Sequence, residues 1–289
     1  MTPIEATVLP VEVAQVKTML SAQELELLYT LARDHYTGQG EIVDGGAFLG
    51  GSTLALACGL RDNPRVVDTS GRIHSYDRFI ADRHVPQFID GWVEGTSTRP
   101  IYDSVIAPVA AQVTVHEGDI TTLPWPADRR IEILFIDIAK TWETNDFLLE
   151  HFFPRLIPGV SRLIQQDYHW PHTPWISITM ELLADHVTYL GSMLWATAHY
   201  RWERALAPGE LPARLRELGA DRLRALAQRG QRFERGGREW TAQQCNLVGL
   251  CLALGQTVDA TTIFEETRAV APEWVDYYKF SPDCGLRGA

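Results

Sequence analysis

Acidic residues stand at the ends of three successive apolar segments in the first half of the chain. The segments are expected strands at 41–44, 73–77 and 113–116, and the acids at or just after their ends are Asp44, Asp77 and Asp119. A carboxylate accepts hydrogen bonds from an ammonium, a pair of hydroxyls or an amino group. Ligands of open parallel sheets bind beyond the carboxyl ends of the strands. Each acid alone would be an ordinary solvated strand end, but three in this order indicate a site for a polar cofactor.

A glycine-rich turn follows the first of these acids and leads into an apolar helix expected at 52–60. From Asp44 to Ser52 the chain reads DGGAFLGGS, with glycines at Gly45, Gly46, Gly50 and Gly51. Glycines let a backbone approach a ligand closely, and the amides of a helix N-terminus point into such a site. The dinucleotide pattern G-x-G-x-x-G and the phosphate-loop ending Gly-Lys-Ser/Thr are both missing. The turn is therefore either a different kind of cofactor loop or a plain strand–turn–helix connection.

Polar side chains also follow the fourth and fifth expected strands. The strand at 132–138 contains Asp137 and leads to Lys140, and the strand at 160–166 runs into Gln166, Asp167 and Tyr168, with His169 and His172 just beyond. Carboxylate and amide oxygens are ligands that magnesium accepts, and a bound divalent ion lowers the pKa of a hydroxyl. Lysine and histidine side chains can take up the released proton. This edge is the candidate catalytic edge.

Strands that alternate with helices predict an α/β fold, with a doubly wound, mostly parallel sheet and helices on both faces. The apolar run ILFIDI suits a strand buried on both faces. Two further helices are expected at 141–153 and 175–187. Residues 188–200 are expected to form two strands that turn at Gly191-Ser192.

Segments outside this alternation define the expected domain organisation. Residues 1–40 are predicted to be helical, with Ser21 and Glu24 as a capping box, and 41–205 to form the sheet domain. A polar loop is expected at 78–100. Residues 206–289 are predicted to form a C-terminal helical extension, with helices at 211–229, 241–254 and 258–270.

Composition narrows the class of protein. The net charge of −11 argues against general nucleic-acid binding, which needs a basic surface. The chain contains no apolar run long enough to span a membrane and no pattern of a secretion signal, so a cytoplasmic protein is expected. The scattered cysteines are then expected to be reduced thiols: Cys58, Cys245, Cys251 and Cys284.

The spacing Asp44-x-Gly46-x-x-x-Gly50-x-Ser52 resembles motif I of class I S-adenosylmethionine-dependent methyltransferases. The resemblance is greatest to the catechol O-methyltransferase-like and macrocin (TylF-like) O-methyltransferases. It implies that Asp44 holds the amino group of S-adenosylmethionine, and that Gly46 and Gly50, with Gly45 in the same loop, flank the methionine part. It also implies that Ser52 binds the cofactor's carboxylate. The family's sheet has seven strands, Rossmann-like, with an antiparallel pair at the end.

The same resemblance assigns roles to the next two acids. Glu117-Gly118-Asp119-Ile120, running into Leu123-Pro124, resembles the family's G-D-x-x-x-L-P segment. This implies that Asp119 receives the adenine amino group and that the amide of Ile120 meets the ring. Asp77 would bind the two ribose hydroxyls.

At the catalytic edge, Asp137-Ile138-Ala139-Lys140 is similar to the family's strand-four aspartate, with a lysine three residues on as general base. The TylF-like D-D-Y segment corresponds to Gln166-Asp167-Tyr168, so the first acid is an amide here. The resemblance implies Mg²⁺ or another divalent cation held by Asp137, Gln166 and Asp167, with Asp137 also among the cofactor contacts. The general base stays open between Lys140, His169 and His172.

These features predict an S-adenosylmethionine-dependent O-methyltransferase that is assisted by a divalent metal and methylates a hydroxyl of a small molecule. A sugar or polyketide of secondary metabolism is the expected acceptor, by analogy only. One alternative is a metal-independent N- or O-methyltransferase with a histidine base. Another is a cofactor-binding or interaction protein without catalysis. A homodimer through the C-terminal helices is also expected.

Overall fold

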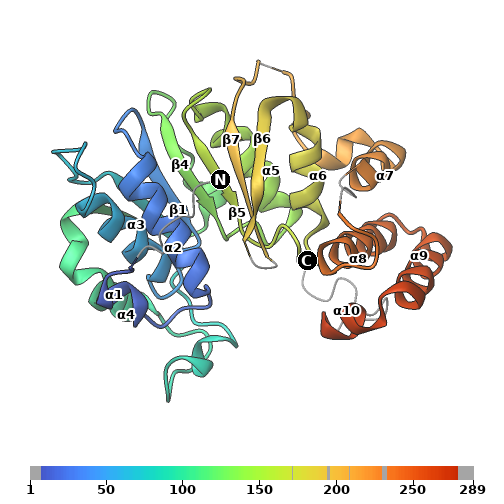
Figure 1. Ribbon diagram of the computed structural model, residues 1–289, viewed down its shortest axis with the longest axis horizontal. Helices are drawn as coiled ribbons and strands as arrows, with labels where there is room; N and C mark the ends of the chain where they lie inside the picture. Colours follow the sequence, from blue (N-terminus) through green and yellow to red (C-terminus); the bar gives the residue numbers. More distant parts are fainter. Residues whose placement is uncertain (1–7, 171, 194–195, 208, 230–232, 279–289) are drawn as a thin grey trace. The chain divides into compact units, whose positions relative to one another are not determined.

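Seven strands and ten α-helices are present in the computed structural model, which describes residues 8–170, 172–193, 196–207, 209–229 and 233–278 (Figure 1). The strands are β1 (Glu41–Gly45), β2 (Ile73–Asp77), β3 (Val113–Glu117), β4 (Ile131–Ile136), β5 (Arg162–Gln165), β6 (Val187–Met193) and β7 (Thr197–Trp202). The helices are α1 (Val11–Ala14), α2 (Ala22–Thr30), α3 (Gly51–Arg61), α4 (Arg99–Ile106), α5 (Trp142–His151), α6 (Pro174–Leu182), α7 (Ala220–Arg229), α8 (Arg238–Ala253), α9 (Thr257–Val270) and α10 (Pro272–Tyr277).

The strands form one sheet in the order β3-β2-β1-β4-β5-β7-β6. β1 pairs in parallel with β2 and β4, β2 pairs in parallel with β3, and β6 and β7 are antiparallel. Every residue of β4 is buried, and the apolar residues at 133–136 suit a central strand. The expected α/β fold with a doubly wound, mostly parallel, seven-stranded sheet is confirmed.

By their contacts the residues group into two compact units. The first runs up to Ile138 and includes Arg155–Leu163; the second comprises Ala139–Pro154 and the chain from Ile164 onward. The first unit therefore contains β1 to β4, and the second contains β6, β7 and the helices from α5 to α10. The division at residues 40 and 205 remains a prediction.

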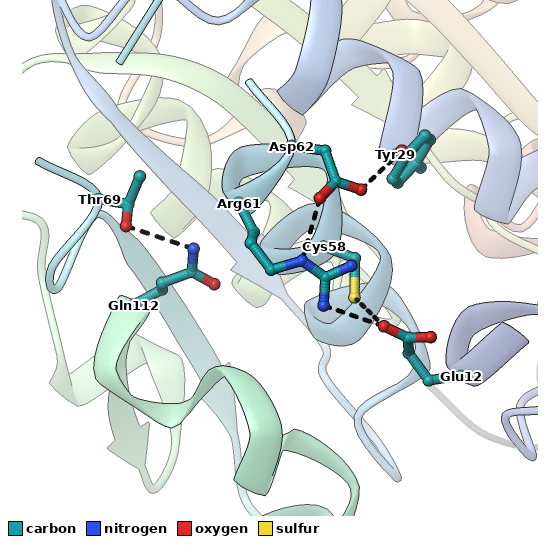
Figure 2. Close-up of polar contacts among 7 residues, drawn as sticks. All are labelled: Glu12, Tyr29, Cys58, Arg61, Asp62, Thr69 and Gln112. Carbon is teal, nitrogen blue, oxygen red and sulfur yellow. Dashed lines mark hydrogen bonds and ion pairs between the residues drawn. The ribbon is translucent and has the colours of Figure 1, made fainter. Parts of the chain in front are cut away.

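A capping box on α2 and polar contacts with α3 position the N-terminal helices of the first unit. Ser21 and Glu24 form the expected capping box at the start of α2. Figure 2 shows Arg61, at the end of α3, donating to Glu12 of α1 at 2.9 Å and to Asp62 at 3.0 Å. Asp62 also accepts from Tyr29 of α2 at 2.8 Å (Figure 2). These contacts hold α1 and α2 against α3, the helix that begins in the glycine turn.

A buried carboxylate sets the entry into β1. Glu132 of β4 is 1% exposed and accepts hydrogen bonds from the backbone amides of Thr37, Gln39 and Gly40. A Cβ at Gly40 would lie 2.8 Å from the Glu132 nitrogen, so only glycine fits where the chain passes β4. The first strand is thereby aligned with its parallel neighbour.

In the second unit, two elements of the structure differ from the sequence prediction. Gly191 and Ser192 do not form a turn, because both lie inside β6 and pair with His199 and Ala198 of β7. Gly191 has a φ of +136° beside a register shift, so the glycine serves a bulge in the strand. The helix expected at 211–229 is interrupted at Gly219, whose φ of +76° ends a short 3₁₀ turn before α7 begins.

None of the described helices has the length and hydropathy needed to cross a membrane. Cys58, Cys245 and Cys251 are buried free thiols, as expected, whereas Cys284 lies outside the described residues.

Candidate cofactor site and catalytic edge

Asp44 is the most deeply buried acid of the candidate cofactor site. Its Oδ2 accepts hydrogen bonds from the hydroxyls of Ser52, at 3.0 Å, and Thr53, at 2.5 Å. Its Oδ1 is buried and has no hydrogen-bond partner. Burial raises the pKa of Asp44 to about 6, against the lowering effect of the two hydroxyls. A ligand group that donates to Oδ1 would remove the cost of leaving this oxygen without a partner.

The glycine turn has a backbone that other residues would not adopt readily. Gly46 and Gly50 have φ values of +101° and +96°, in the left-handed region, and Phe48 between them has a φ of +48°. A Cβ at Gly46 would lie 2.8 Å from the carbonyl carbon and oxygen of Asp137. The amide of Asp137 donates to the carbonyl of Gly45 at 2.7 Å. The turn is thus held against the end of β4, with room for backbone only.

Asp77, at the end of β2, is bound to the same turn. Its two carboxylate oxygens accept from the amides of Phe48, at 2.8 Å, and Phe79, at 2.7 Å. Burial raises the pKa of Asp77 above its usual range, and the amide hydrogen bonds oppose that rise. Each carboxylate oxygen has two lone pairs, so both oxygens can still accept from a diol.

Asp119 and Ile120 follow β3, as expected, and differ in exposure. Asp119 is exposed and caps a 3₁₀ turn by accepting from the amide and the hydroxyl of Thr121. These hydrogen bonds lower the pKa of Asp119 below its usual value. Ile120 is 2% exposed, so its side chain belongs to the core.

A small cavity adjoins the glycine turn and brings in residues that sequence reasoning missed. It is lined from the sheet side by Gly46, Ala47, Phe48, Ser52 and Asp137, and from the N-terminal segment by Thr18, Met19 and Leu20. A Cβ at Gly51 would lie 2.6 Å from the Cβ of Thr18, so this segment lies directly on the start of α3. No local motif marks residues 18–20, because their place depends on how α1 and α2 pack.

The second unit places the expected base Lys140 in contact with Asp167, one of the expected metal ligands. Lys140 forms an ion pair with Asp167 through its Nζ and the carboxylate Oδ2. The Lys140 side chain is 53% exposed, and that of Asp167 is 21% exposed. Gln166 accepts a hydrogen bond from the hydroxyl of Thr197 of β7 through its Oε1. Among the described residues, no group of three or more His, Cys, Asp or Glu side chains is arranged to hold a metal ion.

The two candidate histidines are in different environments. His169 is fully buried, and its Nε2 lies 2.6 Å from the hydroxyl of Ser192. Burial, helped by the charge of Arg238, lowers the pKa of His169 to about 3, so the ring is neutral at pH 7. His172 is half-buried, and burial also lowers its pKa. A general base must reach within about 3 Å of the proton it removes. Lys140 is therefore the most accessible of the three bases expected from the sequence.

Comparisons with known proteins support the fold. No protein-family model matches the chain, and the search of curated proteins found no match. Among solved structures, the O-methyltransferase NovP is similar over 66% of this chain and 84% of its own, with 18% identity and a TM-score of 0.50. The calicheamicin methyltransferase CalS11 is similar over 63% and 78%, with 22% identity and a TM-score of 0.45. An O-methyltransferase from Bacillus cereus is similar over 68% and 84%, with 16% identity and a TM-score of 0.46.

At these sequence identities the similarity concerns the fold alone. The fold assignment rests on the comparison with NovP, whose TM-score is 0.50. The chain has the Rossmann-like fold of the class I S-adenosylmethionine-dependent methyltransferases.

Proposed function

We propose that the protein is an S-adenosylmethionine-dependent O-methyltransferase acting on a hydroxyl of a small molecule. The observation that carries the proposal is the buried Asp44, with one oxygen bound by Ser52 and Thr53 and the other without a partner inside a glycine turn. The ammonium group of the cofactor is positively charged and carries N–H donors, so it can donate a hydrogen bond to this carboxylate oxygen. Phosphate would instead be repelled by the same carboxylate.

The residues around Asp44 fit the rest of the cofactor. Gly46, which only a glycine can occupy against the Asp137 backbone, lines the small cavity beside Asp44, and Asp77 retains lone pairs for the ribose hydroxyls. When bound, S-adenosylmethionine supplies an electrophilic methyl group, so the protein has to orient the acceptor and remove its proton. Lys140 is the proposed base, and it must be neutral when it accepts that proton.

A divalent ion is part of the proposal because of the donors present. Asp137, just after β4, and Gln166 and Asp167, just after β5, carry the oxygen ligands that Mg²⁺ prefers, and such an ion would lower the pKa of an acceptor hydroxyl. One oxygen of Asp167 is already paired with Lys140, and the Gln166 Oε1 accepts from Thr197. These contacts favour weak ion binding, and they keep the metal-independent reaction as a second candidate.

Cofactor binding tests the main proposal directly. Calorimetric titration with S-adenosylhomocysteine should show micromolar binding to the full chain, and Asp44→Asn should weaken it at least tenfold, because a charged acceptor becomes a neutral amide. Asp68→Asn, at an exposed loop position, is the matched control and should change nothing. If Asp44→Asn folded normally and bound the cofactor as tightly as the parent chain, the proposal would be rejected.

The metal part has a separate test. Mg²⁺ should bind the full chain weakly in a titration without cofactor, and Gln166→Asp should bind it more tightly by adding a carboxylate. If neither chain bound Mg²⁺ and a chelator left methyl transfer unchanged, the metal-independent candidate would replace the metal-assisted one.

A further inference from the structure

A second cavity of the first unit, with a volume of about 290 Å³, lies next to the glycine turn. Its volume is close to the lower end of the range for small-molecule sites, about 300–1,000 Å³. Leu49 of the turn lines it, and a Cβ at Gly50 would lie 3.2 Å from Val105 of α4, so the turn and α4 pack closely beside it. The cavity therefore has the size for a small ligand.

The apolar wall of this cavity is entirely aliphatic. Leu49 and Leu54 are 1% and 3% exposed, whereas the wall residues from the loop after β2 and from α4 are half-buried. The aliphatic lining residues are Val16, Leu49, Leu54, Ile89, Ile101 and Val105. A flexible aliphatic chain would bury the half-buried side chains further, and a flat aromatic ligand would find no ring to stack on in this wall.

The charges at the cavity favour an anion. Glu12 lines the cavity but is paired with Arg61, whose guanidinium lies 2.9 Å from the carboxylate, so the two charges cancel (Figure 2). Lys17 also lines the cavity, and its Nζ donates to the carbonyl of Phe88 at 3.0 Å. That partner is neutral, and an ammonium carries three donors, so the positive charge and two N–H groups remain for a ligand.

The contact between Lys17 and Phe88 also positions the ammonium. Lys17 is exposed, so it stands where the cavity meets solvent. The ring of Phe88 lies 5.8 Å from that of Phe48 in the glycine turn. The loop after β2 is thereby held to the turn on one side and to the N-terminal segment on the other, and Ile89 of this loop becomes part of the cavity wall.

We infer that this cavity is a binding site for a small aliphatic monocarboxylate. The aliphatic chain packs against the wall, and the carboxylate accepts hydrogen bonds from Lys17. An alcohol of the same length would fill the same wall but would leave the ammonium without an anion, and an alkylammonium would be repelled by it. The site is separate from the proposed function, because its lining includes none of the residues proposed to bind the cofactor or to remove the acceptor's proton.

The test follows isoleucine methyl signals of the full chain by NMR, without cofactor, during titration with octanoate or 1-octanol. Octanoate should shift the signals of Ile89 and Ile101 and bind about tenfold more tightly than 1-octanol. Lys17→Gln should remove most of this preference and leave 1-octanol binding unchanged, which a general loosening of the fold would not do. Arg130→Gln, at an exposed position before β4, removes the same charge elsewhere in the unit and should keep the preference.

A cavity-filling variant gives an independent readout. Val105→Phe should abolish binding of both probes, whereas Val67→Phe, at a position that is 100% exposed, should not. No shift at Ile89 and Ile101 up to about 10 mM octanoate overturns the site, as do shifts spread over isoleucines throughout the chain. Equal affinity for octanoate and 1-octanol overturns the pairing with Lys17. If Val105→Phe does not fold, the comparison of Lys17→Gln with Arg130→Gln decides. Because no cofactor is present, these results do not depend on the proposed function.

Discussion

At the scale of single residues, the left-handed backbone of Gly46 gives the sharpest prediction. Gly46→Ala should destabilise the protein by about 1–2 kcal/mol from the unfavourable φ. A further loss of about 1–3 kcal/mol should come from the contact with the Asp137 carbonyl. Gly91→Ala is the matched control, because Gly91 has a φ of +75° but a Cβ there would meet nothing within 4 Å. Urea unfolding of both variants measures the difference, and equal losses would contradict a cost from the close approach to Asp137.

The same scale shows what can be predicted from sequence. The acids at 44, 77 and 119 are recognisable because a strand end and a glycine turn are local features. The burial of His169 cannot be recognised from the sequence, because it depends on Ser192 in β6 and on the ring of Phe233, which lies 5.0 Å away. The role of Thr18 is also hidden, since only the packing of α1 and α2 brings it to Gly51.

At the scale of elements, β2 and β3 share a buried histidine pair that should make stability depend on pH. His74 Nδ1 lies 2.9 Å from His116 Nε2, between the rings of Trp125 and Tyr76. Burial, with the charges of His116 and Arg129, lowers the pKa of His74 to about 4, and burial also lowers that of His116. The unfolded chain then binds protons more readily, so the stability present above about pH 6.5 is lost as the pH falls toward 4.

The prediction is a loss of about 3 kcal/mol from His74 between pH 7 and pH 4, in addition to any effect of other groups. His74→Gln, which cannot titrate, should show a flatter pH dependence of the unfolding free energy than the parent chain. His84→Gln, in the loop after β2, should not differ from the parent in this respect. A His74→Gln curve parallel to that of the parent would contradict the assignment.

Glycines in the second unit show why some elements are hard to place from sequence. Gly191 and Gly219 are both strong signals of a break in regular structure, but the residue type does not tell which kind of break occurs. In the structure Gly191 allows a bulge within β6 and Gly219 separates a 3₁₀ turn from α7. The apolar residues at 133–136 in β4 are easier to place, because a short apolar run bounded by polar residues suits a buried strand.

At the scale of the whole molecule, the expected homodimer remains a proposal. Sedimentation equilibrium of the full chain at micromolar concentration should give twice the mass of 32.5 kDa if the C-terminal helices associate. Val258 of α9 is 80% exposed and offers an apolar side chain to solvent. Val258→Asp should then give a monomer and leave cofactor binding intact, whereas a parent chain of monomer mass would contradict the dimer.

The packing of the C-terminal helices bears on the predicted domain boundary at residue 205. Helix α8 is buried from Thr241 to Cys251, and it packs against α6 of the sheet region as well as against α7 and α9. Ile176, Ile178 and Met180 of α6 are almost completely buried. Removing residues 206–289 should expose this helix to water, so we expect the shortened chain to bind a hydrophobic dye and to lose its cooperative thermal transition.

An independent sheet domain would behave in the opposite way. It would melt cooperatively after the truncation, with an unchanged near-ultraviolet circular dichroism spectrum, and would show that the helices are an appendage. A point variant makes the same distinction in the full chain. Leu250→Ala in α8 should cost about 2–5 kcal/mol and lower the stability of the second unit as a whole, whereas Glu265→Ala on the exposed side of α9 should cost almost nothing. A loss at Leu250 that left α6 protected from hydrogen exchange would favour separate folding of the extension.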